Sequence, residues 1–230
     1  DNSWRATLVA WSLPALLVAA ALFLPKRDRA KPVRKVAWLP DWHNPLTLRI
    51  GLLLGLSGSL FFGLNAYMGN LLQHQGQFDK LPDALFWYNL AQVFASLIML
   101  KMARYWVGRR GVIATLASIS LLGAIGAVML TGWWSIVSAT LMSLVAGMLL
   151  ILLVAIPPLV VSAAETGRLS AGTFLVGYTV AFCVPMLGGV VADWTGDARH
   201  ALMLMITYGL LVLPLAFTLN LERKKDQPES

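Results

Sequence analysis

Charged side chains are scarce in this sequence. Asp, Glu, Lys and Arg together make up 13% of the 230 residues, whereas hydrophobic residues make up 58%. A water-soluble domain carries about 25% charged residues and is about half apolar. The composition therefore excludes a separate soluble domain and predicts a chain embedded in a lipid bilayer.

Cysteine is nearly absent as well. The single cysteine, Cys183, lies in an apolar run. A lone cysteine cannot form a disulfide within the chain, and a buried thiol is usually a small packing residue. The sequence begins at Asp1 rather than at Met and shows no signal peptide. We therefore expect a processed product or one portion of a longer polypeptide.

Charged residues and histidine are missing from the depth of every long apolar run. A charge at mid-membrane costs about 2.5–3.5 kcal/mol on insertion scales, so one retained there usually marks a function. The runs offer no carboxylate for a proton relay, no lysine for a Schiff base and no cluster of metal ligands. Membrane proteases and hydrolases gather such groups at one depth. We therefore expect no enzyme activity, no metal site and no cofactor.

What the sequence does contain is a series of seven apolar stretches. About 20 apolar residues in a helix cross the roughly 30 Å of hydrocarbon in a bilayer. Each stretch reaches that length or comes close to it, and polar residues such as those at 165–168 separate them as predicted turns. The predicted spans cover residues 6–24, 50–72, 84–100, 112–130, 136–164, 169–192 and 201–221.

The basic residues lie in alternate gaps between these spans. Of the 18 Lys and Arg residues, 15 lie in the first, third and fifth gaps and in the tail, and 3 lie on the other side. Basic loops face the cytoplasm, so the pattern predicts a multi-pass membrane protein with its N-terminus outside and its C-terminus in the cytoplasm. The net charge of +7 then reflects anionic lipid headgroups rather than nucleic acid.

Uncharged polar residues recur inside the spans. Asn89, Gln92 and Ser96 are spaced i, i+3 and i+7, which places them on one helical face. Such residues either form hydrogen bonds between helices or line a cavity for a small polar solute. The candidates for contacting a solute are Asn65, Tyr67, Asn89, Gln92 and Tyr178.

The second span also carries a small residue at every fourth position, from Gly51 through Gly55 and Ser59 to Gly63. This spacing lets two helix backbones approach closely. Static packing is the first interpretation, and a helix that slides on its partner is the second. Pro157-Pro158 and Pro185 predict helix kinks.

Two motifs resemble those of a known family. Gly108-Arg109-Arg110 resembles the end of the cytoplasmic motif G-x-x-x-D-R-x-G-R-[KR], although Lys101, Tyr105 and Trp106 depart from it. The second motif is similar to P-x-x-x-G-x-x-x-D-x-T-G, with Pro185, Gly189, Asp193 and Gly196 at its defining positions. On these motifs the chain resembles the C-terminal part of a major facilitator superfamily transporter. Residues 62–72 and Gly177-Tyr178 look most like the cyanate porter group of bacterial carriers, and this resemblance implies a location in a bacterial plasma (inner) membrane.

The resemblance implies a fold and a set of roles. The fold is an all-α integral membrane protein with seven transmembrane helices, the last six resembling one half-bundle of such a transporter. The substrate is held between two half-bundles, so the missing N-terminal half-bundle is a partner. Spans two, three, five and six would face the cavity. Gly108, Arg109, Arg110, Pro185, Gly189, Asp193 and Gly196 would be conformational motif residues. The implied parts are a helix resembling helix six (1–25), a cytoplasmic basic linker (26–49), the bundle (50–221) and a cytoplasmic tail (222–230).

The predicted function is secondary active transport of a small polar solute, with an anionic solute as one option, by alternating access. This chain would supply the C-terminal half only. A non-transporting membrane scaffold and a seven-helix sensor are the alternatives. The very short loops and the lack of a lysine in the seventh span stand against the sensor.

Overall fold

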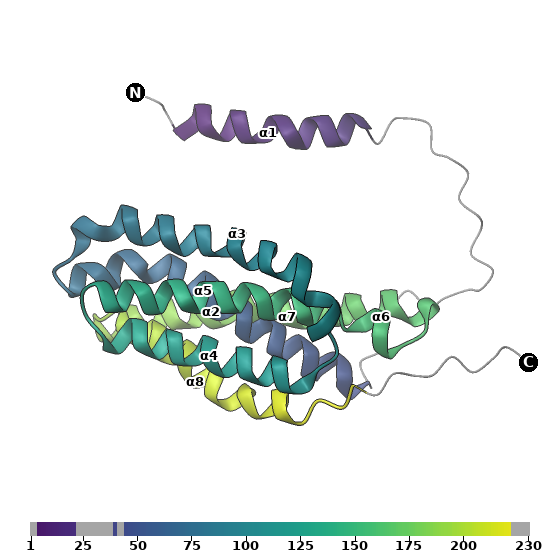
Figure 1. The fold of residues 1–230 in the computed structure, drawn as a ribbon. Helices are drawn as coiled ribbons and strands as arrows, with labels where there is room; N and C mark the ends of the chain where they lie inside the picture. Colours follow the sequence, from purple (N-terminus) through teal and green to yellow (C-terminus); the bar gives the residue numbers. More distant parts are fainter. Residues whose placement is uncertain (1–3, 22–38, 41–43, 222–230) are drawn as a thin grey trace, which may run out of the picture. The chain divides into compact units, whose positions relative to one another are not determined.

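A computed structural model describes residues 4–21, 39–40 and 44–221 of this chain, and the described residues form helices and turns without any strand (Figure 1). They divide into two units, residues 1–35 and 36–230. The first unit contains α1 (Trp4–Ala21). The second contains α2 (Pro45–His74), the short η1 (Phe78–Lys80), α3 (Leu81–Trp106), α4 (Arg110–Met129), α5 (Trp133–Val154), α6 (Pro157–Val160), α7 (Ala163–Thr195) and α8 (Arg199–Phe217).

Six helical stretches of the second unit are long and apolar enough to cross a membrane, with α5 and α6 together counted as one. They support a multi-pass membrane protein. The first predicted span is also helical, as α1, but it is not among these six, so the seventh span stays a prediction. The predicted linker and tail lie outside the described residues, apart from 39–40 and 44–49. Residues 45–49 already belong to α2.

The predicted turn at 165–168 is wrong, because these residues belong to the first turns of α7. The chain breaks earlier, after Val154, where Pro157 and Pro158 have no backbone N–H to continue the hydrogen bonding of α5. The next helix begins after Ser162, whose carbonyl accepts hydrogen bonds from the backbone N–H groups of Glu165 and Thr166. The fifth predicted span is therefore two helices, and the sixth begins at Ala163.

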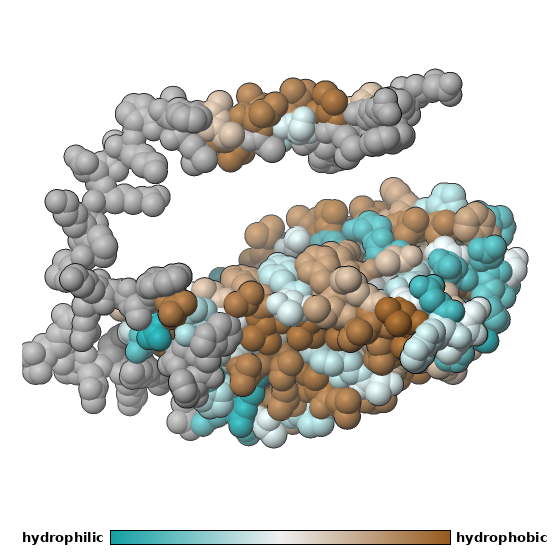
Figure 2. All heavy atoms as spheres, turned by 180° about the vertical axis from the view of Figure 1, so that it is seen from behind, coloured by the Kyte–Doolittle hydropathy of each residue, from teal (hydrophilic) through white to brown (hydrophobic). Residues whose placement is uncertain are grey.

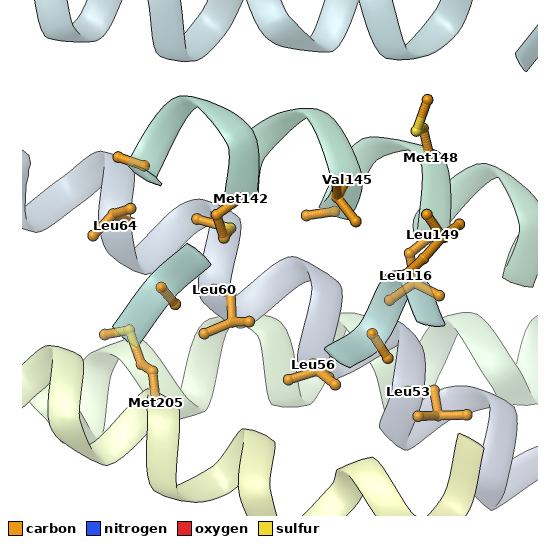
Figure 3. Close-up of a cluster of buried hydrophobic side chains, with 14 of the residues drawn as sticks. Leu53, Leu56, Leu60, Leu64, Leu116, Met142, Val145, Met148, Leu149 and Met205 are labelled. Carbon is orange, nitrogen blue, oxygen red and sulfur yellow. The ribbon is translucent and has the colours of Figure 1, made fainter. Parts of the chain in front are cut away.

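The helix α2 lies at the centre of the second unit and packs on α3, α4, α5, α7 and α8. Leucines repeat along it every three or four residues, which keeps them on one face. Figure 3 shows this face meeting α4, α5 and α8. The buried side chains labelled there are Leu53, Leu56, Leu60 and Leu64 of α2, Leu116 of α4, Met142, Val145, Met148 and Leu149 of α5, and Met205 of α8.

The small residues of α2 bring it against α7. A Cβ atom built on Gly51 would lie 2.7 Å from Val176 Cβ, and one built on Gly55 would lie 2.8 Å from Val180 Cβ. Side chains at these two positions would force the helices apart, since a Cβ atom cannot rotate away. Gly63 instead faces Met205 of α8. The small-residue pattern thus corresponds to close packing of α2 on two different helices.

The charged residues of this unit collect at the helix ends. Consecutive long helices run antiparallel (Figure 1), so alternate turns share one end of the bundle. Figure 2 shows hydrophobic residues along the length of one face, with hydrophilic residues gathered at one end. Among the described residues of this unit, one end has Arg49, Lys101, Arg104, Arg109, Arg110, Arg168 and Glu165, and the other has Lys80, Arg199, Asp79, Asp83, Asp193 and Asp197.

Candidate functional site

A cavity of about 210 Å³ lies among α2, α3, α5 and α7. Two of the five predicted solute contacts, Gln92 and Tyr178, line it. No described residue in its lining carries a charge. The full lining is Leu54, Ser57, Gly58, Phe61, Phe62, Gln92, Ala146, Gly147, Leu150, Gly177, Tyr178 and Ala181.

Gln92 is held in place by α5. Its Nε2 donates to the carbonyl of Ser143 at 2.6 Å and to Ser143 Oγ at 2.9 Å. Ser143 Oγ in turn donates to the carbonyl of Tyr88 at 2.7 Å, and the Tyr88 hydroxyl donates to the carbonyl of Phe61 at 2.9 Å. This network ties α3, α5 and α2 together behind the cavity. It fixes the amide plane of Gln92, because both N–H groups of Nε2 donate to Ser143.

The other amide atom of Gln92 faces the cavity wall. A Cβ atom built on Gly147 would lie 2.5 Å from Gln92 Oε1, so the glycine leaves the space that this oxygen occupies. Among the described residues, the hydrogen bonds of the Gln92 amide are those donated by Nε2, and none is accepted by Oε1. The Ser57 hydroxyl, by contrast, donates a hydrogen bond to the carbonyl of Ala146 at 2.7 Å. The cavity therefore offers an oriented acceptor, Gln92 Oε1, to a ligand that donates an N–H or O–H group.

Three aromatic rings also line the cavity, those of Phe61, Phe62 and Tyr178. The rings of Phe62 and Phe182 are stacked with centroids 5.3 Å apart, and Phe61 meets Phe62 edge-on at 5.4 Å. Tyr178 stacks on Phe174 at 5.9 Å, and its side chain is 42% exposed. It also borders a shallow hollow on the outer face of α7. The cavity thus reaches the surface of the unit beside Tyr178.

Asn65 and Asn89 form a pair outside the cavity lining. Asn65 Nδ2 donates to Asn89 Oδ1 at 3.2 Å, which joins α2 to α3. Asn89 Nδ2 donates to the carbonyl of Leu85 in its own helix at 2.8 Å. Asn89 and Gln92, predicted to share one face, are therefore directed at different neighbouring helices.

Tyr67 and two residues of the second motif lie together. The Tyr67 hydroxyl donates to the carbonyl of Pro185 at 3.1 Å, and a Cβ atom built on Gly189 would lie 2.8 Å from the Tyr67 hydroxyl oxygen. Pro185 lies inside the continuous helix α7, where it leaves one carbonyl of the preceding turn without its helical donor. Tyr67 therefore braces α2 against α7 near this proline and does not line the cavity.

Replacing Tyr67 with phenylalanine removes this brace. We expect Tyr67→Phe to lower the free energy of unfolding by about 1 kcal/mol, because one interhelical hydrogen bond is lost. Thermal unfolding of the purified chain in detergent measures the change. Tyr178→Phe is the matched control, since the Tyr178 hydroxyl forms no hydrogen bond within the described residues. Equal destabilisation by both substitutions would contradict the brace.

The two motifs otherwise build turns. Gly108 between α3 and α4 has φ +80° and Gly196 after α7 has φ +70°, both in the left-handed region that favours glycine. Arg109 and Arg110 are exposed, and so is Asp193. Hydrogen bonds from the Arg199 side chain and backbone to Asp197 hold the pKa of that carboxyl at about 2. The carboxylate therefore stays ionised at neutral pH and accepts the hydrogen bonds of Arg199 next to Gly196.

Several residues of the cavity were not predicted from the sequence. Ser57 and Gly147 of the lining, and Ser143 behind it, are single small or polar residues in apolar helices, and their role depends on the helix that each one contacts. Phe61 and Phe62 were not among the predicted solute contacts either. Among the described residues no group of three or more His, Cys, Asp or Glu side chains is placed to hold a metal ion. The arrangement supports hydrogen bonding and stacking with a small ligand.

Comparison with known proteins adds no assignment, because no protein-family model and no curated protein matches this chain.

Proposed function

We propose that the six long helices form the C-terminal half-bundle of a secondary active transporter of the major facilitator type, in a bacterial plasma membrane. The observation that carries the proposal is the cavity among α2, α3, α5 and α7. These are the four helices that the resemblance assigns to the substrate side. A small polar solute would bind there, with Gln92 as acceptor and Tyr178 at the mouth.

The packing of the helices supports two internal repeats. The helix α2 packs on α7 as α5 packs on α3, and α4 packs on α5 as α8 packs on α2. If α2, α3 and α4 correspond to α5, α7 and α8 in that order, the contact between α2 and α7 corresponds to the contact between α5 and α3. The contact between α4 and α5 then corresponds to the contact between α8 and α2. Three-helix repeats of opposite membrane orientation are a hallmark of such transporters, which bind substrate near the repeat interface.

The exposure of the helices supports a missing second half. Within this unit 67% of the α2 span is buried, but only 28% of the α3 span and 17% of the α7 span. Many of the exposed side chains of α7 are large and apolar, with Phe182, Met186 and Leu187 among them. Such a surface suits another apolar helical bundle or lipid. An N-terminal half-bundle would cover it and close the cavity.

The residues that line the cavity limit the chemical class of solute that would bind there. Gln92 Oε1 accepts a hydrogen bond, and the rings of Phe61, Phe62 and Tyr178 provide stacking surfaces. An anionic solute would take its positive partner from the other half-bundle, because no Lys, Arg or His lines the described cavity. The basic end of the bundle would face the cytoplasm, in keeping with the position of most of the described cations.

Solute binding tests this proposal on the purified chain. We expect at least one solute in a panel of small amides, amino alcohols and organic acids to raise the melting temperature in detergent, since a ligand at about 100 times its Kd stabilises by ~2.7 kcal/mol. Gln92→Leu should abolish the shift. Ser96→Ala is the matched control, because the Ser96 hydroxyl lies one turn away and bonds to its own helix. An unchanged shift in Gln92→Leu, or no shift with a fixed protein partner co-purifying, would contradict the proposal.

A further inference from the structure

A second hollow, unrelated to the cavity above, lies at the basic end of the bundle. It is a groove of about 1020 Å³ between the start of α4 and the chain that follows α8. Trp106, Arg109 and Arg110 line its mouth, and Leu219 and Leu221 line the wall that follows α8. Few ligand sites exceed about 1000 Å³, so the groove is large enough for a sizeable molecule.

The groove continues along α4 into the membrane-spanning part. An adjoining hollow of about 560 Å³ shares four lining residues with the groove, namely Arg110, Gly111, Thr115 and Ile119. Gly111, Thr115 and Ile119 are spaced i, i+4 and i+8, so they form one stripe on α4 that is about 12 Å long. Phe217, the last residue of α8, also lines this hollow. The hollow therefore begins among cations and continues along apolar and small side chains.

Neither Arg109 nor Arg110 forms an ion pair with a carboxylate among the residues that the structure describes. Within the described residues the only ion pairs join Asp197 to Arg199 and to His74, which lie at the opposite end of the bundle. Arg49, near the same wall, donates to the carbonyl of Thr218 at 3.3 Å. Arg109 and Arg110 are exposed, and no described carboxylate occupies their guanidinium groups. Arginine binds phosphate through two parallel N–H groups, which makes it a strong phosphate ligand.

We propose that this groove binds an anionic phospholipid, with Arg109 and Arg110 on the headgroup phosphate and an acyl chain along the Gly111–Thr115–Ile119 stripe of α4. Charge complementarity selects the headgroup, since anionic lipids gather at basic surfaces of membrane proteins. The apolar continuation of the groove selects a lipid over a free phosphate. Trp106 at the mouth lies where an indole ring rests at the headgroup level.

Native mass spectrometry of the delipidated full chain tests the proposal. Phosphatidylglycerol and phosphatidylcholine with the same acyl chains are titrated separately. We expect phosphatidylglycerol to bind about tenfold more tightly, because each basic residue near an anionic headgroup contributes measurably. The double substitution Arg109→Gln/Arg110→Gln should remove this preference, and Thr115→Trp should weaken binding by filling the stripe while keeping both arginines.

The matched control is Lys101→Gln/Arg104→Gln, which removes the same charge at the same end of the bundle but outside the groove. It should keep the preference for phosphatidylglycerol. Circular dichroism establishes that each variant remains helical. Equal loss in both double variants would mean general charge attraction and would overturn the proposal. Displacement of the lipid by millimolar inorganic phosphate, or full binding to Thr115→Trp, would overturn it as well.

Discussion

Leucine in place of Gly55 should separate α2 from α7 and destabilise the bundle by about 3 kcal/mol, at the upper end of the usual cost of overpacking. The new Cβ atom would lie 2.8 Å from Val180 Cβ and 3.1 Å from the Tyr208 hydroxyl oxygen. That hydroxyl donates to the carbonyl of Leu52 at 2.8 Å, so the substitution also breaks a hydrogen bond between α8 and α2. Thermal unfolding in detergent should show a melting temperature lower by roughly 5–10 °C.

Gly167→Leu is the matched control for this substitution. Gly167 lies in the first turns of α7, and a Cβ atom built there meets no atom within 4 Å. The melting temperature of this variant should stay within about 2 °C of the wild-type value, since exposed substitutions rarely change stability by more than ~0.5 kcal/mol. If Gly55→Leu melts like Gly167→Leu, the close packing of α2 on α7 is wrong.

Transport by this chain alone should be undetectable. The proposed carrier alternates access by rocking one half-bundle on the other, and α3 and α7 have no second bundle to rock against in the described unit. Proteoliposomes containing the purified chain should therefore show no saturable accumulation of the solute found by thermal shift. A complete carrier should show saturable uptake of this solute, and this chain alone should show none.

Adding an N-terminal half-bundle provides the positive arm of this experiment. Co-reconstitution with a half-bundle encoded next to this sequence should restore saturable uptake, and Gln92→Leu should reduce kcat/KM at least about tenfold by removing an oriented acceptor. Saturable uptake by the isolated chain would show that one half suffices and would contradict the half-bundle proposal. Uptake that is restored but unaffected by Gln92→Leu would move the substrate site away from the cavity.

The sequence predicted six of the seven spans, because the length of an apolar run shows directly whether a helix could cross a bilayer, whereas the first span stays a prediction. It failed at residues 165–168, since polar residues in the first turn of a helix look the same as a loop. The structural break depends on Pro157 and Pro158, which the sequence showed but which were interpreted as a kink within one span. Hydropathy cannot distinguish a kinked helix from two helices, because both remain apolar throughout.

The candidate site was predictable only in part for a different reason. Helical periodicity placed Asn89, Gln92 and Ser96 on one face, but it does not identify the helix opposite that face. Gln92 reaches Ser143 of α5, whereas Asn89 reaches Asn65 of α2, and these pairings join residues 51 and 24 positions apart. A single sequence carries no signal for such contacts when both partners are small uncharged residues in apolar helices.

Cysteine labelling from one side of the membrane tests the central claim, which is that the long helices cross the bilayer with their basic turns on one side. Single cysteines replace Lys80 and Arg104 in a Cys183→Ser background, because these two positions lie at opposite ends of α3. A membrane-impermeant maleimide applied to intact cells should label Lys80→Cys, and it should label Arg104→Cys only after permeabilisation. Equal labelling of both positions in intact cells would contradict the topology and the proposed transporter with it.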